Sequence, residues 1–234
     1  MDARTREILE GISTATITTV LLKKGLRNVW LRGPFPKQPN QARVVGTAFT
    51  LRFVPAREDL ATPASWASPI STRTAIEAME EGVIAVADAM GVTDAGIFGD
   101  ILCARMAQRK VAGLITDGVM RDMEGVLATG LPVWCAGAAA PASVASLTFV
   151  NWQEPVACGG VAIFPGDTIV ADGDGAVVIP QAMLAEVVGQ AAEQEIQESW
   201  IINEVHRGVP LPGLYPPNEE TKARYAAWRK ENKK

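Results

Sequence analysis

The sequence has few of the residues that build zinc centres and redox-active dithiol sites. It contains one histidine and three cysteines among 234 residues, and no two cysteines form a C-x-x-C pair. Because such sites need several of these side chains close together, neither kind of site is expected. The separated cysteines are typical of reduced thiols in a cytoplasmic protein, and we interpret all three as small core residues. The single histidine, His206, is expected at the surface.

Sequence signatures of three other chemistries are also missing. No G-x-G-x-x-G segment occurs, so a nucleotide-binding loop of the Rossmann type is not expected. The eight lysines all lie in polar or terminal contexts, which argues against the desolvated lysine of a Schiff-base enzyme. The segment from Asp172 alternates aspartate and glycine like a calcium loop, but Met183 occupies the twelfth position, where a bidentate glutamate is required. We predict a tight turn between strands there.

Charge and hydropathy argue against two kinds of partner. The net charge is −4 and the pI is about 5.2, so we expect no basic field for a phosphate backbone and no nucleic-acid ligand. The longest uncharged stretch, residues 125–153, is broken by Gly130, Pro132 and Pro141. It is therefore predicted to form buried strands and turns, and no membrane span is expected. The first ten residues alternate acids and bases and lack the apolar run of a signal peptide.

The composition predicts a single globular domain. With 48% hydrophobic and 21% charged residues, the chain can bury a substantial core without disulfides. No internal repeat or long linker divides it. We predict one domain over residues 1–234, with a core of about 8–208 and a C-terminal tail of 209–234. The tail ends in a basic helix, whose Tyr225 and Trp228 are expected to dock on the body or on a neighbouring subunit.

The pattern of apolar residues predicts an α/β arrangement. Short apolar runs that end in polar residues alternate with helical segments, which an all-helical protein would not show. Expected strands cover residues 44–54, 83–88, 111–117 and 131–135, with short antiparallel or mixed strands between 156 and 180. Expected helices cover residues 2–22, in two parts with Ser13 and Thr14 both able to cap the second part, and 74–81, 100–110 and 183–207.

Two segments place a carboxylate where a strand ends or a helix begins. Gly99 and Asp100 precede a predicted helix, where a glycine lets a ligand approach the backbone and the free N–H groups favour an anion. Arg121 and Asp122 follow a predicted strand. The guanidinium offers a fixed fork of donors to a keto acid, and the adjacent carboxylate can hold a hard cation. Taken alone, both segments also fit an N-capping aspartate and a surface ion pair.

Several longer motifs occur in a fixed order along the chain. Residues 82–122 carry VIAVAD and GDILCARMAQRKVAGLITDGVMRD, and elsewhere stand STATITTVLLKKG, VVGTAFTL, LPVW, CGGVAIFPGD and ADGDGAVVIP. Together they resemble the RraA-like family, which includes the 4-hydroxy-4-methyl-2-oxoglutarate aldolases. The resemblance covers roughly residues 8–217, and several motifs in the same order are more specific than any one of them.

The resemblance carries implications for fold and assembly. It implies an α/β fold of the three-layer β/β/α swivelling-domain type, with a C-terminal helical extension. It also implies a homotrimer, or a hexamer of stacked trimers, with active sites at the subunit interfaces. A heterologous contact that closes into a ring would let the C-terminal helix of one subunit complete the next site. The glutamate supplied in this way is expected to be Glu198, with Glu195 as the alternative.

Particular residues match the family's site. Asp122 matches the single protein ligand of Mg²⁺ or Mn²⁺, with waters and substrate oxygens completing the shell. Arg121 matches the arginine that contacts the pyruvyl oxygen and stabilises the enolate. Asp100 matches the acid that binds the water shell of the metal. The backbone N–H groups of Ile101 and Leu102 are expected to receive the substrate carboxylate.

The activity implied by the resemblance is that of a metal-dependent pyruvate aldolase. Such an enzyme cleaves a 4-hydroxy-2-oxo acid to pyruvate and a carbonyl product, and decarboxylation of oxaloacetate passes through the same enolate. The substrate stays open, because the long tail and Trp200 could reshape the mouth of the cleft. The alternative comes from another class, since some relatives are non-catalytic protein regulators of ribonuclease activity.

Overall fold

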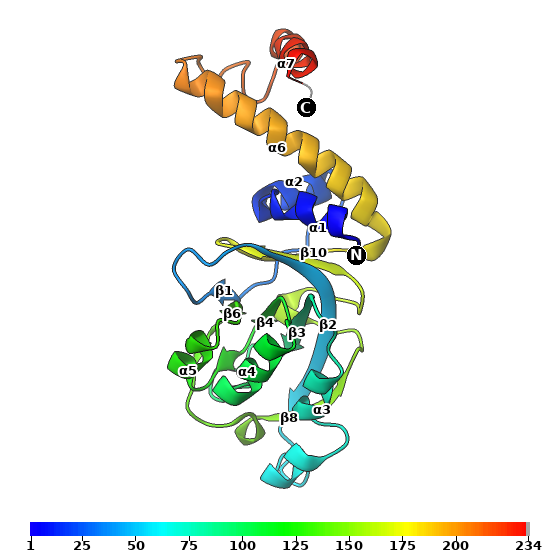
Figure 1. Cartoon of the computed structure of the whole chain (residues 1–234), viewed down its shortest axis with the longest axis vertical. Coiled ribbons are helices and arrows are strands. Elements are labelled where there is room, and N and C mark those ends of the chain that lie inside the picture. The colour runs from blue at the N-terminus through cyan, green and yellow to red at the C-terminus, as the bar shows by residue number, and fades with distance from the viewer. Residues whose placement is uncertain (233–234) are drawn as a thin grey trace.

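A curved mixed sheet organises the protein (Figure 1). The computed structural model describes residues 1–232. The sheet has the order β1-β6-β4-β3-β2-β9-β10, and β8 pairs with β2 off this path. Its strands are β1 (Phe35–Pro36), β2 (Val44–Pro55), β3 (Val83–Asp88), β4 (Gly113–Thr116), β6 (Val133–Cys135), β8 (Leu147–Trp152), β9 (Thr168–Asp172) and β10 (Gly175–Ile179). A second, two-stranded sheet joins β5 (Val119–Met120) to β7 (Gly137–Ala138).

The large sheet has a parallel half and an antiparallel half. Strands β2, β3, β4 and β6 run parallel, whereas β9 pairs antiparallel with both β2 and β10. The long strand β2 belongs to both halves. Residues Ile84 to Ala87 of β3 are fully buried, as expected for a parallel strand that is covered on both faces. The β9–β10 hairpin confirms the strands and the tight turn predicted around Asp172.

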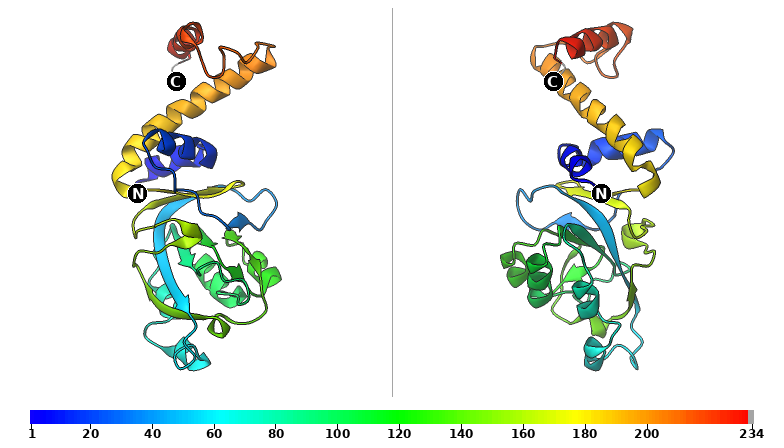
Figure 2. Two further views of the ribbon diagram at one scale, coloured as in Figure 1. Left: turned by 180° about the vertical axis from the view of Figure 1, so that it is seen from behind. Right: turned by 45° about the vertical axis from the view of Figure 1, so that its right-hand side comes forward.

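Helices cover the two ends of this sheet (Figures 1 and 2). They are α1 (Ala3–Glu10), α2 (Thr14–Lys23), η1 (Pro63–Ala67), α3 (Thr72–Glu77), α4 (Asp100–Gln108), α5 (Met123–Ala128), η2 (Ser143–Ala145), η3 (Cys158–Gly160), η4 (Gln181–Met183), α6 (Leu184–His206) and α7 (Glu219–Glu231). Helices α3, α4 and α5 pack on the parallel half through a cluster that contains Ile76, Met106 and Val126. Helices α1, α2 and α6 share a second cluster with β9 and β10. The predicted α/β class is confirmed.

Some element boundaries differ from those predicted. The helix predicted at 74–81 begins at Thr72, because the hydroxyl of Ser71 accepts a hydrogen bond from the backbone N–H of Thr74, at 3.3 Å. The predicted cap at Ser13 is confirmed, since its hydroxyl accepts from the N–H of Thr16, at 3.1 Å. The stretch 125–153 was predicted as strands and turns alone, and this is wrong for its start, which belongs to helix α5.

The C-terminal helices form an extension on one side of the body (Figure 2). The second half of α6 stands away from the sheet, and α7 packs back against α6. Tyr225 and Trp228 of α7 lie on the buried cluster of Trp200, Ile201 and Leu214, so they dock within the chain's own extension. In the described residues, none of the helices combines the length and the apolar character that crossing a bilayer requires.

Candidate active site

Backbone pairing brings the two carboxylate-bearing segments together. The N–H of Ile97 donates to the carbonyl of Val119 at 2.9 Å, and the N–H of Arg121 donates to the carbonyl of Phe98 at 3.0 Å. The segment that leads into α4 therefore runs alongside the segment that leads into α5. Contacts between α4 and α5 continue this alignment beyond the two bonds. Segments more than twenty positions apart in the sequence thus meet at the beginnings of two helices.

Six residues predicted for the site line one cavity of about 220 Å³, and they are Gly99, Asp100, Ile101, Leu102, Arg121 and Asp122. The Arg121 and Asp122 side chains are 38% and 49% exposed, so both reach solvent and neither points into the packed interior. The cavity is small and polar groups meet in it, which suits a small charged ligand.

Asp122 has a strained backbone. Its φ of 52° and ψ of 44° are left-handed, a conformation that costs roughly 1–2 kcal/mol for an L-residue and that aspartate tolerates better than most. Oδ2 accepts a hydrogen bond from Nε of Arg121 at 3.0 Å. Oδ1 accepts none from any residue between 1 and 232. Strain of this kind persists only where the surrounding structure stabilises the conformation, and it is common at functional positions.

Two glycines leave room for the carboxylates. A Cβ atom at Gly99 would lie 3.0 Å from Oδ2 of Asp122, and a Cβ atom at Gly125 would lie 2.8 Å from Cβ of Asp100. A side chain at either position would displace an aspartate. The predicted role of Gly99, an open approach to the backbone, therefore has a steric counterpart in the structure.

The donor set determines which metal the cavity could hold. In the described part of the chain, no group of three or more His, Cys, Asp or Glu side chains is placed to bind a metal ion. Asp100 and Asp122 offer carboxylate oxygens only, and one oxygen of Asp100 already accepts the N–H of Ile101 at 2.7 Å. That N–H was predicted to receive the substrate carboxylate, but in this structure it is bonded to Asp100. Mg²⁺ and Mn²⁺ prefer oxygen ligands, and Mg²⁺ commonly keeps most of its shell as water. The residues present fit such a water-rich site, in which Asp122 would be the direct ligand.

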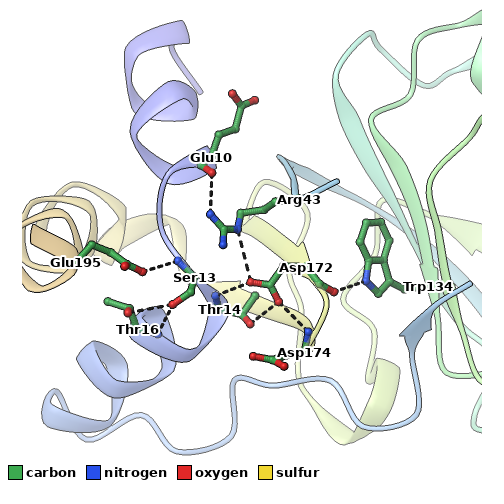
Figure 3. Close-up of polar contacts among 9 residues, drawn as sticks. All are labelled: Glu10, Ser13, Thr14, Thr16, Arg43, Trp134, Asp172, Asp174 and Glu195. Atoms are coloured by element: carbon green, nitrogen blue, oxygen red, sulfur yellow. Dashed lines mark hydrogen bonds and ion pairs between the residues drawn. The ribbon is translucent and has the colours of Figure 1, made fainter. Parts of the chain in front are cut away.

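Asp172, in the calcium-like segment, has a structural role (Figure 3). Its carboxylate accepts hydrogen bonds from the N–H and the hydroxyl of Thr14, at 2.9 and 2.7 Å, and from the N–H of Asp174, at 3.0 Å. Its carbonyl accepts the indole N–H of Trp134 at 2.8 Å. These bonds tie the start of α2 to the β9–β10 turn and agree with the rejection of a calcium loop.

Two further buried aspartates are also occupied by the backbone. Asp117, which follows β4, accepts the N–H of Ala89 at 2.8 Å and that of Gly159 at 3.0 Å. Asp88, at the end of β3, accepts the N–H of Ala157 at 2.9 Å. Burial raises the pKa of Asp117, and the hydrogen bonds from Gly159 and Ala89 oppose that rise. These carboxylates hold neighbouring loops in place, and they line a different cavity from Asp100 and Asp122.

The two glutamates considered for the site lie on α6 and do not line the cavity of their own chain. Glu195 accepts the N–H of Ser13 at 2.7 Å, as Figure 3 shows. Glu198 accepts from the amide of Gln194 at 2.9 Å and from the hydroxyl of Thr16 at 3.4 Å. Glu195 thus helps to cap α2, while Glu198 is held more loosely. That a neighbouring copy supplies Glu198 stays a prediction.

Glu195 gives a prediction for the pH dependence of stability. Burial raises the pKa of its carboxyl, but hydrogen bonds from Ser13 and Thr16 outweigh burial, and the pKa is lowered from 4.5. Its stabilising effect is therefore complete above the unfolded-state pKa and is lost as the pH falls through the folded-state pKa. Glu195→Gln should lower the free energy of unfolding at neutral pH, and the deficit should shrink at about pH 3. Urea titrations at both pH values measure it, and an equal deficit at both would contradict the role of the charge.

Among the cavity residues that the sequence reasoning gave no role are an aromatic ring and a second arginine. Trp66 of η1 and Arg73 of α3 line the same cavity as Arg121. The guanidinium carbon of Arg73 lies 4.9 Å from the centre of the Trp66 ring. Nothing in the local sequence of these two residues indicates the cavity. They reach it because η1 packs on α3 and α3 packs beside α4.

The fold and the cavity define an α/β protein with an arginine–aspartate pair at a small, open site, and comparison with known proteins identifies the family. The model of the RraA-like family, described as Aldolase/RraA, matches residues 14–178. This range contains the parallel half of the sheet and every cavity residue named above. The chain belongs to the RraA-like family.

Solved structures confirm the predicted RraA-like fold. Streptomyces coelicolor RraAS2, described as an unusual member of the RNase ES inhibitor RraA protein family, is 35% identical to this chain. The match covers 86% of this chain and 96% of that chain, with a TM-score of 0.77. An uncharacterized protein from Pseudomonas syringae pv. tomato is 27% identical, with coverages of 92% and 98% and a TM-score of 0.78.

Sequence relatives carry different names. Protein DlpA of Legionella pneumophila is 30% identical over 169 residues. A protein of Halalkalibacterium halodurans, provisionally named 4-hydroxy-4-methyl-2-oxoglutarate aldolase, is 34% identical over 117 residues. The two matches cover 72% and 50% of this chain but 26% and 55% of the relatives. The chain therefore spans about a quarter and about half of their lengths.

Proposed function

We propose that this protein is a divalent-metal-dependent aldolase that cleaves a 4-hydroxy-2-oxo acid to pyruvate and a carbonyl product. The observation that carries the proposal is the convergence of Arg121, Asp122 and Asp100 on one cavity of about 220 Å³. The strained Asp122 and its unoccupied oxygen add to it. The provisional name of the Halalkalibacterium halodurans relative points to the same chemistry.

Arg121 binds the oxygen on which negative charge develops. Its Nε donates to Asp122, and this bond orients the guanidinium while its terminal nitrogens make no hydrogen bond to a described residue. Cleavage of the C3–C4 bond sends its electron pair toward C2, where an enolate oxygen forms. A divalent cation held by Asp122 would supply Lewis-acid stabilisation of that oxygen. The guanidinium fork adds a second, fixed positive contact.

Asp100 and the start of α4 handle the other end of the reaction. One oxygen of Asp100 accepts the N–H of Ile101, which leaves the second oxygen to take the proton of the 4-hydroxyl, directly or through a water. The N–H of Leu102 lies in the first turn of α4, where backbone donors have no partner within the helix. Together with the helix dipole it favours the substrate carboxylate.

The proposed enzyme is a cytoplasmic homotrimer or hexamer. In this arrangement α6 of one subunit brings Glu198 to the cavity of the next. Glu198 does not reach the cavity of its own chain, because it packs beside α2 and accepts the hydroxyl of Thr16. Two features support a contact between copies. Ile101 is 80% exposed beside the cavity, and the second half of α6 projects from the body (Figure 2). Ring closure would bury such surfaces.

Removal of the metal tests the proposal. Pyruvate release from 4-hydroxy-2-oxo acids and from oxaloacetate, followed through lactate dehydrogenase, should require Mg²⁺ or Mn²⁺. EDTA should reduce it to the uncatalysed rate, and excess Mg²⁺ should restore it, because the carboxylates bind the ion reversibly. Pyruvate release that persists in EDTA would contradict a metal mechanism. No release from any of these acids would contradict the aldolase itself.

A second candidate function is regulation of a ribonuclease by direct binding. The similarity to RraAS2, which extends over 86% of this chain, favours it. A retained Arg121–Asp122 pair does not require that the chain use it. The two functions separate in one comparison, in which the purified protein is tested for pyruvate release and for inhibition of an RNase E-type ribonuclease. Tight inhibition without metal-dependent turnover would reverse the ranking.

A further inference from the structure

The cavity contains a second arginine that the mechanism above does not use. Arg73 is the second residue of α3 and lines the cavity with Arg121 and Asp122. Trp66, from η1, lines it as well. Both residues come from a part of the chain that supplies no group to the pyruvyl end of a substrate. The cavity therefore has two cationic groups from separate elements, and among residues 1–232 only Arg121 of these two has a partner acid.

Arg73 has no acidic partner in the described part of the chain. Its Nη1 donates to the hydroxyl of Thr72 at 3.4 Å, a long contact, and it forms no salt bridge there. Glu77, the acid of the same helix, pairs with Arg105 at 2.7 Å and with Arg109 at 3.2 Å. Burial lowers the pKa of Arg73, and no nearby acid offsets this effect. Such a guanidinium is suited to an anionic ligand.

Trp66 fixes the orientation of this cation. The guanidinium carbon lies 4.9 Å from the ring centre, within the range of a cation–π interaction. The indole restricts where the guanidinium can move, so Arg73 loses less conformational entropy when it binds a ligand. The fork of terminal nitrogens remains free to bind a planar carboxylate through two hydrogen bonds.

The size of the cavity limits the ligand. The volume of the cavity is about 220 Å³, and it opens to solvent. This suits a short-chain acid that reaches from Arg121 to Arg73. A neutral or sugar-derived chain would cover Arg73 without pairing its charge, and covering an unpaired charge costs free energy.

We propose that Arg73, held by Trp66, binds the second carboxylate of a dicarboxylic 2-oxo acid whose pyruvyl end lies at Arg121 and Asp122. This inference rests on the proposed function and narrows its substrate class. During cleavage the C3–C4 electron pair passes to the pyruvyl half, and Asp100 takes the proton of the 4-hydroxyl. A proton returned to C3 then converts the enolate to pyruvate. The second carboxylate stays with the other half, so the carbonyl product is itself an oxo acid.

Two ligands that differ in one group test the inference. The first is 2-oxoglutarate, and the second is 2-oxopentanoate, which lacks the terminal carboxylate. Calorimetry with Mg²⁺ should show that the wild type binds 2-oxoglutarate about 10- to 100-fold more tightly, as a charged hydrogen-bonded pair provides. In Arg73→Ala the two ligands should bind about equally, because the affinity for 2-oxoglutarate falls while that for 2-oxopentanoate is unchanged. Arg73→Lys should keep part of it, since an ammonium retains the charge without the fork.

Further variants separate binding from structure. Trp66→Phe should keep more of the preference than Trp66→Ala, because a phenyl ring still supports the cation. Arg105→Ala, which removes an arginine paired with Glu77 outside the cavity, is the matched control and should behave as wild type. Circular dichroism and light scattering of each variant report fold and assembly.

Several results would overturn the role of Arg73. One is a wild type that binds the two ligands equally. Another is an Arg73→Ala variant that keeps the preference for 2-oxoglutarate, or that loses affinity for both ligands to the same extent. A third is an Arg73→Ala variant whose oligomer dissociates. Pyruvate release is measured alongside binding. A preference that depends on Arg73 without any pyruvate release would overturn the aldolase and keep the dicarboxylate site. Pyruvate release without a preference for 2-oxoglutarate would support the aldolase and overturn the dicarboxylate site.

Discussion

Asp122→Ala is expected to reduce metal-dependent pyruvate release by at least about 10³-fold, more than the loss of one oxyanion donor in other enzymes. The reason is that Asp122 is the direct ligand in the proposed site, and the described residues hold no cluster of three metal-binding side chains that could take its place. Its removal also frees Arg121, whose Nε pairs with it at 3.0 Å. Steady-state kinetics at saturating Mg²⁺, together with Mn²⁺ binding by electron paramagnetic resonance, measure both losses.

The fold should survive this change. The Arg121–Asp122 pair is well exposed, and exposed pairs contribute little to stability. Replacing the left-handed residue by alanine adds strain, so Asp122→Asn, which tolerates that conformation, serves as a second variant. Glu124→Ala removes an exposed acid from the first turn of α5, outside the cavity, and is the matched control. Metal-dependent turnover that persists in both Asp122 variants would contradict the role of Asp122.

Arg121→Ala is expected to lower kcat by about 10²- to 10³-fold, the usual effect of removing one contact to a developing oxyanion. The substrate can still bind through its carboxylate at α4, so the loss should appear in kcat more than in KM. Arg121→Lys should be intermediate, because an ammonium supplies charge but no fork. Kinetic constants for one 4-hydroxy-2-oxo acid, measured for all three proteins, test the prediction. A rise in KM of the same size, with kcat unchanged, would assign Arg121 to ground-state binding instead.

The sequence alone was sufficient to locate the two segments, around Asp100 and around Asp122, that line the cavity. Each stands where a strand ends or a helix begins, and such positions are visible from local apolar patterns. The order of the motifs then allowed the family resemblance, and with it the fold, to be predicted. The structure supplies what local patterns do not contain, namely that Phe98 and Arg121 are hydrogen-bonded neighbours and that the two segments share one cavity.

The residues that sequence reasoning missed depend on tertiary packing. Trp66 and Arg73 reach the cavity only because η1 packs on α3 and α3 packs beside α4. Glu195 was considered for a neighbouring site, but in its own chain it accepts the N–H of Ser13 across 182 positions of sequence. Helix α5 was missed because it has only six residues, too few to show a helical period.

The central claim is that a cation at Asp122 and the guanidinium of Arg121 stabilise a pyruvate enolate, and proton exchange tests it most directly. In D₂O, the enzyme with Mg²⁺ should exchange the methyl protons of pyruvate, which nuclear magnetic resonance follows without knowledge of the carbonyl partner. The exchange should stop in EDTA and in Asp122→Ala, and it should slow in Arg121→Ala. Exchange that continues in EDTA and in both variants, or no exchange by the wild type with Mg²⁺, would contradict the account.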